Sequence, residues 1–368
     1  MVSTQFTINY GAVLQAYSLQ RSLTKAAGEG SVEVINYSPK SARYGHFESY
    51  SFSSLKSSLV SICKLFNPIY RRSRKDKIQA FSRFLRKEFF LTKTEYVDGQ
   101  ELSATDFRYD IVFVGSDQVW NHRVIDDEVF KLNFVDGVNT KKVSFAASIG
   151  GAMDGSDLDC LCKHLIDFKE ISLREPTCID DIERLTNKKV EVLMDPVFLT
   201  SREEWLGLSK SSDLPVEKKY ILVYEVNSPP GFGRYVQYLK ENSEYGIVVL
   251  STRPFPKYRG VSTISNASPY DYVRLFSKAE FVLTSSFHGV AFSCILNIPF
   301  SCVLNSERSE RQRSLLDTLD LGFCDIFEVE SLRENMQRQF NWSGVNEKIK
   351  KEVAKSRRFI ARALDRND

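Results

Sequence analysis

The chain has 368 residues, of which 42% are hydrophobic and 26% charged, and its 50 Lys and Arg against 47 Asp and Glu give a formal charge of +3. This composition excludes a disordered, collagen-like or coiled-coil chain. The near-neutral charge argues against a nucleic-acid partner. The length indicates two domains. No stretch approaches the roughly 18 uninterrupted apolar residues that a membrane span needs.

Strands and helices alternate in the first half of the sequence. Short apolar runs, two of which end in turn residues, are typical of buried parallel strands, and helical patterns of 12 residues stand between some of them. This alternation predicts βαβ units and a parallel sheet. We expect strands at 32–35, 110–114, 143–147, 170–173 and 190–194, and helices at 12–23 and 157–168.

Residues 40–108 interrupt that alternation and are predicted to be a helical insertion in the first domain. The insertion carries a strongly basic run at 71–77. Such a run is commonly the solvated face of a helix. The alternative is attachment to an anionic membrane surface or an acidic glycan.

A polar break at 209–219 separates the first strand series from a second one. The second series predicts strands at 220–224, 247–250, 281–283 and 300–304, and a long amphipathic helix closes the chain. We therefore expect an N-terminal domain at 1–209, a C-terminal domain at 210–335 and a terminal helix within 336–368.

Two polar stretches in the first half are candidate parts of a site, because ligands bind at the carboxyl ends of strands in open parallel sheets. Asn9 and Gly11 open a helix whose first N–H groups could hold an anion or a hydroxyl, although an ordinary helix cap has the same pattern. Asp117 follows the strand at 110–114 and could act as a base or orient a sugar hydroxyl. Trp120 could stack on a sugar, or it could be a buried core residue.

Two further candidates follow later strands. Arg174 ends the strand at 170–173, where a guanidinium suits a carboxylate or phosphate, and a structural pair with Glu175 is the alternative. His288 stands at a strand-to-helix turn and has the right pKa range for acid–base work at neutral pH. Neither the histidines, the carboxylates nor the seven scattered cysteines stand at metal-ligand spacing, so we expect no metal.

Six segments in one order give the chain a resemblance to the polysaccharide pyruvyl transferase family. They cover roughly residues 5–325. The segments are 9–17 (Asn-Tyr-Gly-Ala-Val-Leu-Gln-Ala-Tyr), 115–121 (Gly-Ser-Asp-Gln-Val-Trp-Asn), 146–150 (Ala-Ala-Ser-Ile-Gly), 172–175 (Ser-Leu-Arg-Glu), Asp195-Pro196 with Trp205, and 286–292 (Ser-Phe-His-Gly-Val-Ala-Phe).

The resemblance implies an α/β fold of two Rossmann-like domains whose parallel sheets face each other across a cleft, as in GT-B glycosyltransferases, with the terminal helix packing back on the first domain. It implies transfer of pyruvate from phosphoenolpyruvate to two hydroxyls of one sugar, in a cell-surface polysaccharide or its lipid-linked precursor. His288 would then be the acid–base residue and Arg174 the clamp for the donor anion. No cofactor is expected besides this donor.

One departure from the family pattern concerns charge. Many members carry Arg two residues before the histidine, and this chain has Ser286 there. Arg311, together with Arg308 and Arg313, is the candidate for supplying the missing charge. The first strand is also expected to be short, because only eight residues precede Asn9.

Two other functions stay open at this point: a GT-B-type glycosyltransferase that uses a nucleotide-sugar, and a catalytically idle glycan-binding homologue. The N-terminus lacks the basic and long apolar regions of a signal peptide. We therefore expect a cytoplasmic location, with peripheral contact at the inner face of the membrane as its extension.

Overall fold

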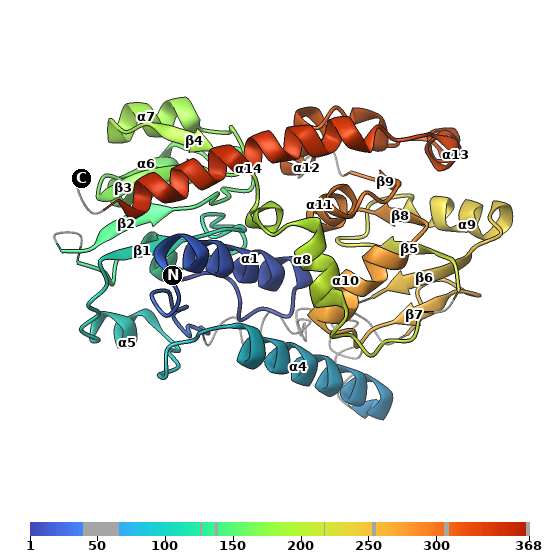
Figure 1. The fold of residues 1–368 in the computed structure, drawn as a ribbon, viewed down its shortest axis with the longest axis horizontal. Helices are drawn as coiled ribbons and strands as arrows, with labels where there is room; N and C mark the ends of the chain where they lie inside the picture. Colours follow the sequence, from blue (N-terminus) through green and yellow to red (C-terminus); the bar gives the residue numbers. More distant parts are fainter. Residues whose placement is uncertain are drawn as a thin grey trace. The chain divides into compact units, whose positions relative to one another are not determined.

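A computed structural model describes residues 1–39, 66–125, 127–136, 139–216, 218–251, 255–304 and 309–365 (Figure 1). The chain divides into two compact units. The first combines Met1–Tyr44, Glu88–Thr200 and Glu347–Asp368, and the second combines Gly45–Lys87 with Ser201–Asn346. Each unit contains a parallel sheet with its own buried apolar core.

The sheet of the first unit has the strand order β1-β2-β3-β4, and all its pairs are parallel. These strands are largely buried because apolar runs such as Ile-Val-Phe-Val in β1 have no polar face to turn toward water. The bounds are β1 (Ile111–Val114), β2 (Lys141–Ser144), β3 (Phe168–Leu173) and β4 (Val190–Val192).

Isolated bridges extend this sheet beyond β1. Val2 pairs with Val114, and Val34 pairs with Leu91, both in parallel. The amide of Ile35 donates to the carbonyl of Met1 at 2.8 Å, and this bond joins the segment around Val34 to the segment around Val2. The order across the sheet is therefore Leu91, Val34, Val2, β1, β2, β3, β4. The N-terminal segment at Val2 therefore lies between Val34 and β1. The chain continues from Val2 toward Val34 on one side and from β1 toward β2 on the other, which is the reversal of strand order typical of Rossmann folds.

Helices complete the first unit. The helical segments are α1 (Tyr10–Ala27), α5 (Gly99–Ser103), η1 (Glu128–Lys131), α6 (Gly155–Leu165), α7 (Ile179–Thr186), η2 (Pro196–Leu199) and most of α14 (Trp342–Leu364). Figure 1 shows α14 as one long helix (red). Its Phe359 packs edge-on against Phe145 with ring centroids 6.0 Å apart, and its Arg362 donates to Glu170 and Glu191.

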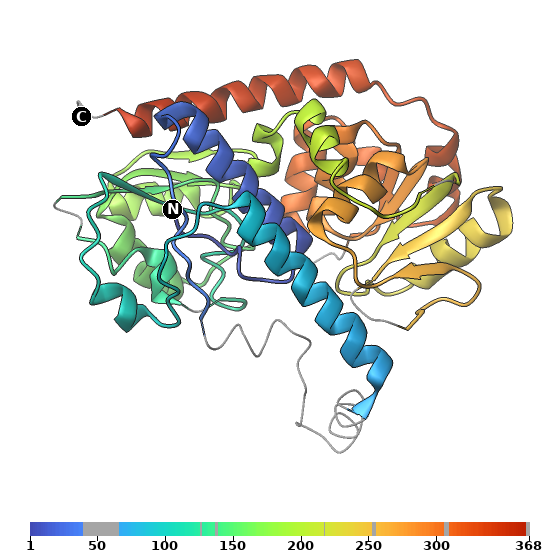
Figure 2. The same ribbon diagram turned by 60° about the horizontal axis from the view of Figure 1, so that its bottom comes forward.

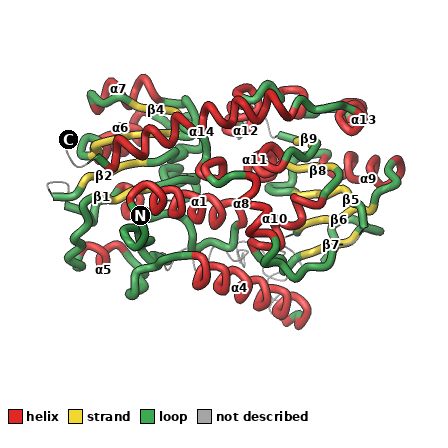
Figure 3. Tube along the Cα trace, viewed as in Figure 1, coloured by secondary structure: helices red, strands yellow, loops and turns green. Residues whose placement is uncertain are grey.

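The second unit has a parallel sheet with the strand order β7-β6-β5-β8-β9 (Figure 3). Its strands are β5 (Tyr220–Tyr224), β6 (Gly246–Leu250), β7 (Ser262–Ile264), β8 (Phe281–Thr284) and β9 (Phe300–Cys302). Its helices besides α4 are α8 (Arg202–Ser209), α9 (Phe232–Asn242), α10 (Pro269–Lys278), α11 (Phe287–Leu296), α12 (Glu310–Thr318), η3 (Gly322–Cys324) and α13 (Val329–Gln337).

Helix α4 (Pro68–Glu88) is the long light-blue helix in Figure 2. By its contacts it belongs almost entirely to the second unit. The insertion at 40–108 was predicted to belong to the first domain. This prediction is wrong for the residues of α4, which belong to the second unit up to Lys87. The reason is packing: the ring of Phe84 meets that of Tyr270 at 4.8 Å, and the hydroxyls of Ser73 and Ser265 lie 2.9 Å apart. The remainder of the insertion up to residue 65 lies outside the described residues.

The α/β class with two parallel sheets, as expected from the sequence, is confirmed. Several local expectations differ from the structure. The strands expected at 143–147, 190–194 and 300–304 end earlier, at Ser144, Val192 and Cys302. The expected strand at 32–35 is reduced to a bridge at Val34, and the helix expected at 157–168 ends at Leu165 because Phe168 already begins β3. Among the described helices, none is both long and apolar enough to cross a membrane.

Candidate active site

In the first unit, the sheet topology brings two of the candidate segments together. The chain leaves the sheet on opposite sides after Val2 and after β1, and crevices at such switch points are where open α/β sheets bind ligands. Gln15 of α1 spans this point. Its Nε2 donates to the hydroxyl of Ser3 at 2.8 Å, and its Oε1 accepts from the amide of Ser116 at 3.0 Å.

The loop after β1 can take its path only because Gly115 has no side chain. Gly115 has φ +128°, and a Cβ there would lie 2.2 Å from the carbonyl oxygen of Phe145. The next residues carry the site: the hydroxyl of Ser116 donates to the carbonyl of Ala146 at 2.5 Å, and Asp117 follows with φ 66°. Asp117 bridges to Ala147, which in turn bridges to Leu173, so the edge of the sheet continues past β1, β2 and β3.

Arg174 lies at this edge, directly after β3, and only 2% of its side chain is exposed. Its Nη2 donates to the hydroxyl of Ser116 at 2.7 Å and lies 2.8 Å from Oδ2 of Asp195. Its Nη1 is 3.7 Å from Oδ1 of Asp117. One guanidinium therefore lies between two carboxylates, and the charge of Arg174 is balanced within the protein.

The two carboxylates differ in exposure. The side chain of Asp195 is fully buried and its Oδ1 accepts from the amide of Val197, which fixes the start of η2. The side chain of Asp117 is 16% exposed. Of the two carboxylates, Asp117 is thus the more exposed one, and Arg174 lies between it and Asp195.

Glu175 is fully buried and binds the loop after β2. Its Oε1 accepts from the hydroxyl of Ser148 at 2.9 Å, from the amide of Ile149 at 2.8 Å and from the amide of Gly150 at 2.9 Å. The sequence left open a structural surface pair between Arg174 and Glu175. In the structure both side chains are buried, and they bind different partners: Arg174 binds Ser116 and Asp195, and Glu175 binds the loop after β2. Glu175 orders the loop that adjoins Asp117, because the amide of Ser148 donates to the carbonyl of Asp117.

Asn9 and Gly11 form an ordinary helix cap. The side-chain oxygen of Asn9 accepts from the amides of Gly11 and Ala12 at 3.0 and 3.4 Å. These two N–H groups are therefore satisfied by the cap, which is the alternative that the sequence left open. Any contact of Asn9 and Gly11 with a ligand stays a prediction.

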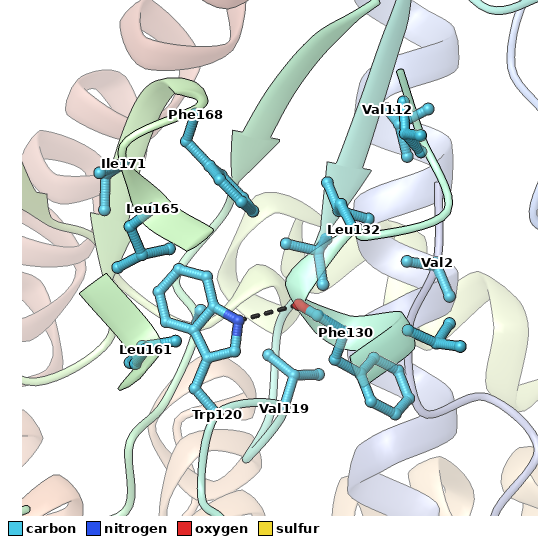
Figure 4. Close-up of a cluster of buried hydrophobic side chains, with 14 of the residues drawn as sticks. Val2, Val112, Val119, Trp120, Phe130, Leu132, Leu161, Leu165, Phe168 and Ile171 are labelled. Carbon is cyan, nitrogen blue, oxygen red and sulfur yellow. Dashed lines mark hydrogen bonds between the residues drawn. The ribbon is translucent and has the colours of Figure 1, made fainter. Parts of the chain in front are cut away.

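Trp120 packs in the core, and this corrects the expectation that it stacks on a sugar. It is 3% exposed, and its Nε1 donates to the carbonyl of Phe130 at 2.9 Å. Figure 4 shows the indole among Leu161, Leu165 and Phe168, with this hydrogen bond dashed. A buried indole with a satisfied N–H serves packing.

In the second unit, the switch point lies between β5 and β8, because the chain passes from β5 to β6 on one side and later returns to β8 on the other. His288 stands at the start of α11, directly after β8, and is 7% exposed. Its ring meets that of Phe287 edge-on at 5.2 Å. The topology therefore puts His288 at the ligand-binding edge of its sheet.

A close helix–strand contact holds α11 in place. A Cβ at Gly289 would lie 2.2 Å from Oγ1 of Thr284, so only glycine allows this approach. The same hydroxyl donates to the carbonyl of Tyr224 and accepts from the amide of Ser286. These bonds join the ends of β5 and β8 to the first turn of α11.

Ser286 is the N-cap residue of α11, but its side chain accepts no capping hydrogen bond. It is instead hydrogen-bonded to the hydroxyl of Tyr224. Burial raises the pKa of Tyr224 well above its ordinary value, and the Ser286 contact opposes that rise only in part. Tyr224 is therefore a neutral hydrogen-bonding group beside the helix start.

Arg311 is the arginine of α12 that reaches this region. Its guanidinium carbon lies 5.8 Å from the ring centroid of Phe287, the residue next to His288. Arg313, also in α12, forms an ion pair instead: its Nε lies 3.5 Å from Oδ2 of Asp325. Arg308 lies outside the described residues.

The structure thus collects the predicted residues into two groups, one in each unit. Asp117 and Arg174 form the first, and Ser286, His288 and Arg311 form the second. Sequence reasoning gave no role to four residues that hold these groups: Gln15, Ser116, Asp195 and Tyr224. Within the described part of the chain, no group of three His, Cys, Asp or Glu is arranged to hold a metal ion.

Comparisons with known proteins identify one family. The family model for polysaccharide pyruvyl transferase matches residues 9–307. No curated protein matches the chain significantly.

Solved structures are similar only at low identity. UDP-GlcNAc 2-epimerase from Methanocaldococcus jannaschii is 11% identical, with 89% of this chain and 90% of that chain covered and a TM-score of 0.49. The heptosyltransferase WaaC from E. coli, solved with ADP, is 12% identical, with 95% and 98% covered and a TM-score of 0.38. A functionally uncharacterized protein from Klebsiella pneumoniae is 15% identical, with 70% and 88% covered and a TM-score of 0.36.

Proposed function

This chain belongs to the polysaccharide pyruvyl transferase family, and we propose that it transfers pyruvate from phosphoenolpyruvate to two hydroxyls of one sugar. The acceptor would be a cell-surface polysaccharide or its lipid-linked precursor. The observation that carries the proposal is the position of His288, the acid–base candidate, at the switch point of the second sheet.

The proposed reaction needs one proton donor, one proton acceptor and groups that bind anions. A proton adds to the methylene carbon of phosphoenolpyruvate, and the adjacent carbon gains oxocarbenium character. One sugar hydroxyl forms a bond to that carbon, the bond to the phosphate oxygen breaks, and a second hydroxyl closes the cyclic ketal. Of the two hydroxyl protons, one is balanced by the new methyl C–H and the other leaves with phosphate.

His288 is proposed as the residue that moves the proton. An imidazole can donate and accept at neutral pH, and such proton transfer contributes about 10²–10⁴-fold to a rate. The contact with Phe287 and the Gly289–Thr284 contact fix the start of α11, which supports a defined position for the ring. An acid that approaches a single carbon atom requires such a defined position.

Asp117 is proposed to accept a proton from, or to orient, a sugar hydroxyl. Its partly exposed carboxylate beside buried Arg174 supports this role. By resemblance Arg174 clamps the donor anion. Its bonds to Ser116 and Asp195 support a second role, which is to hold Asp117 in the orientation that the hydroxyl requires.

Arg311 is proposed to supply positive charge for the carboxylate or phosphate of the donor. Its contact with Phe287, the residue next to His288 in the sequence, supports this role. Ser286, which stands at the position of the family's arginine, would then contribute a hydroxyl rather than a charge. Asn9 and Gly11 remain proposed as a hydroxyl-binding turn.

The test combines the protein, phosphoenolpyruvate and a panel of lipid-linked and nitrophenyl sugars. We expect release of inorganic phosphate and a product whose mass equals acceptor plus one pyruvyl ketal. His288→Asn should lower the rate about 10²–10⁴-fold. His164→Asn is the matched control, because this partly exposed histidine of α6 lies 3.4 Å from Glu128, away from both groups of site residues.

Two results would overturn the proposal. One is no phosphate release and no ketal product across a broad panel, together with a nucleotide-sugar that is consumed or that raises the melting temperature. The other is glycan binding that persists unchanged when His288 and Arg174 are both replaced by alanine, without turnover of phosphoenolpyruvate by the unmodified chain.

A further inference from the structure

Helix α4 has an inner face that packs on the second unit. Phe84 makes the ring contact with Tyr270, and Ser73 bonds to Ser265. The buried residues recur at helical spacing and thus lie on one side: Tyr70, Lys77, Phe81 and Phe84.

The opposite face is basic and exposed. Its members follow one another at intervals of three or four residues, which is one stripe of an α-helix: Arg72, Lys75, Gln79, Arg83 and Arg86. From first to last this stripe extends about 21 Å at a rise of about 1.5 Å per residue. The helix contains eight basic and two acidic residues, whereas the whole chain has a formal charge of +3. Positive charge is therefore concentrated here.

Two large apolar side chains stand at the N-terminal end of this stripe. Phe66 is 80% exposed, the highest value among the exposed large apolar residues that are described, and Ile69 is 62% exposed. Exposed apolar groups beside a row of basic groups are typical of helices that lie in a membrane interface. Clusters of four to eight Lys and Arg on such a helix bind anionic lipid headgroups.

We propose that the outer face of α4 docks on an anionic lipid bilayer, with Arg72, Lys75, Arg83 and Arg86 on the headgroup phosphates and with Phe66 and Ile69 inserted among the acyl chains. The apolar pair favours lipid over nucleic acid, because a nucleic-acid backbone offers nothing that would bury an aliphatic side chain. This docking does not rest on the proposed reaction, and it would place a soluble enzyme beside acceptors that are anchored in the membrane.

Vesicle sedimentation tests the charge. The full chain should sediment with phosphatidylcholine vesicles that contain phosphatidylglycerol, and not with pure phosphatidylcholine vesicles. Binding should weaken as salt rises, because exposed charges are screened. The combined changes Arg72→Glu, Lys75→Glu, Arg83→Glu and Arg86→Glu should lower the partition coefficient at least about a hundredfold, since each basic residue contributes about fivefold.

A matched variant separates this face from net charge. Helix α14 also has exposed basic residues, and their replacement by glutamate changes the charge by the same amount: Lys350, Lys351, Arg357 and Arg358. That variant should keep most of the vesicle binding. The proposal is overturned if both variants lose binding equally, or if the unmodified chain binds RNA or DNA but not anionic vesicles.

The apolar pair has its own test. Phe66→Ser with Ile69→Ser should lower binding by about tenfold or more and leave a residual binding that is more sensitive to salt. Melting temperature and phosphate release with a soluble acceptor should stay unchanged in every variant, which excludes unfolding as the cause. Binding by the Phe66/Ile69 variant that equals that of the unmodified chain would exclude insertion.

Discussion

A buried guanidinium between two carboxylates defines the first unit's site at the level of residues. Burial of Arg174 and Asp195 is tolerated because their opposite charges lie 2.8 Å apart, and the partly exposed Asp117 adds a second carboxylate near Arg174. Removal of one partner leaves the others buried without compensation, and this costs more than the pair contributes when intact. A structural role for Arg174 can therefore be separated from a role in ligand binding.

Arg174→Ala should lower the free energy of unfolding by about 3–5 kcal/mol, because Asp195 then stays buried beside an empty space. Arg174→Lys should lower it less, since the ammonium keeps the charge but cannot reach Ser116, Asp117 and Asp195 with one planar group. Urea denaturation measures both values. Stability equal to that of the unmodified chain, with activity lost, would instead indicate that Arg174 acts only on the ligand.

Thiol reactivity is a second prediction at this scale. Burial raises the pKa of Cys162 to about 11 and raises the pKa of Cys294, Cys302 and Cys324 well above its ordinary value. These thiols stay protonated at pH 8, and the thiolate is the reactive form. Exposed Cys160 should therefore be alkylated before these four thiols, which should react only on unfolding. Mass spectrometry after timed iodoacetamide treatment measures this order, and early labelling of Cys302 would contradict it.

Some site residues could be predicted from the sequence and others could not, for a physical reason. Asp117, Arg174 and His288 follow buried strands. Because the strands of each sheet are parallel, each of these residues lies at the carboxyl edge of its own sheet. The partner of Arg174 is Asp195, and nothing local signals a pair that forms across two strands. Trp120 was ambiguous because a core indole and a sugar-stacking indole have the same local sequence.

At the level of elements, the contact of α11 with β8 is the tightest constraint on His288. Gly289→Ala would bring a Cβ within 2.2 Å of Oγ1 of Thr284, so the helix must shift. We expect the free energy of unfolding to fall by about 1–3 kcal/mol, as for overpacking. If the proposed reaction holds, its rate should fall by at least about tenfold. Calorimetry and phosphate release measure the two effects.

Thr284→Ala in the Gly289→Ala background should restore part of both losses, because it removes the hydroxyl that the new Cβ would meet. Restoration stays partial, since Thr284 also bonds to Tyr224 and Ser286. Gly115→Ala is the contrasting case: its Cβ would meet the backbone oxygen of Phe145, which no substitution removes. Additive effects in the double variant would show that the contact is not what requires glycine.

Strands were predictable in proportion to their burial. The apolar runs that became β1, β5 and β8 are buried almost throughout and stand out in the sequence. β7 was missed because Ser262–Ile264 has only one apolar residue and lies at the edge of its sheet. The unit to which α4 belongs could not be predicted, since its inner face has no feature that distinguishes one apolar surface from another.

At the level of the whole molecule, each unit is assembled from separate stretches of chain. The first unit requires Glu347–Asp368, which come after the entire second sheet in the sequence. Phe359 is fully buried there, and Lys355 donates to the carbonyl of Val192 at 2.8 Å. The terminal helix is thus part of the first unit's core.

A chain that ends at Asn346 should therefore lose protection selectively. Amide hydrogen exchange should become faster in β2, β3 and β4, while β5 and β8 should exchange as before. The reason is that Phe145 after β2 loses Phe359, and that Glu170 of β3 and Val192 of β4 lose their bonds to Arg362 and Lys355. Arg362→Ala is the mild control, since ion pairs at a partly exposed side chain contribute about 0–1 kcal/mol. Equal loss of protection in both sheets would contradict the division into two units.

The interleaving of the units has a consequence for biosynthesis. A ribosome delivers Met1–Thr200 first, yet the helix that covers Phe145 is translated last. The nascent first sheet must wait through the synthesis of Ser201–Asn346 with part of its apolar surface uncovered. Apolar surface that is exposed during synthesis favours aggregation, so pauses in translation after residue 200 should increase aggregation more than pauses before residue 100.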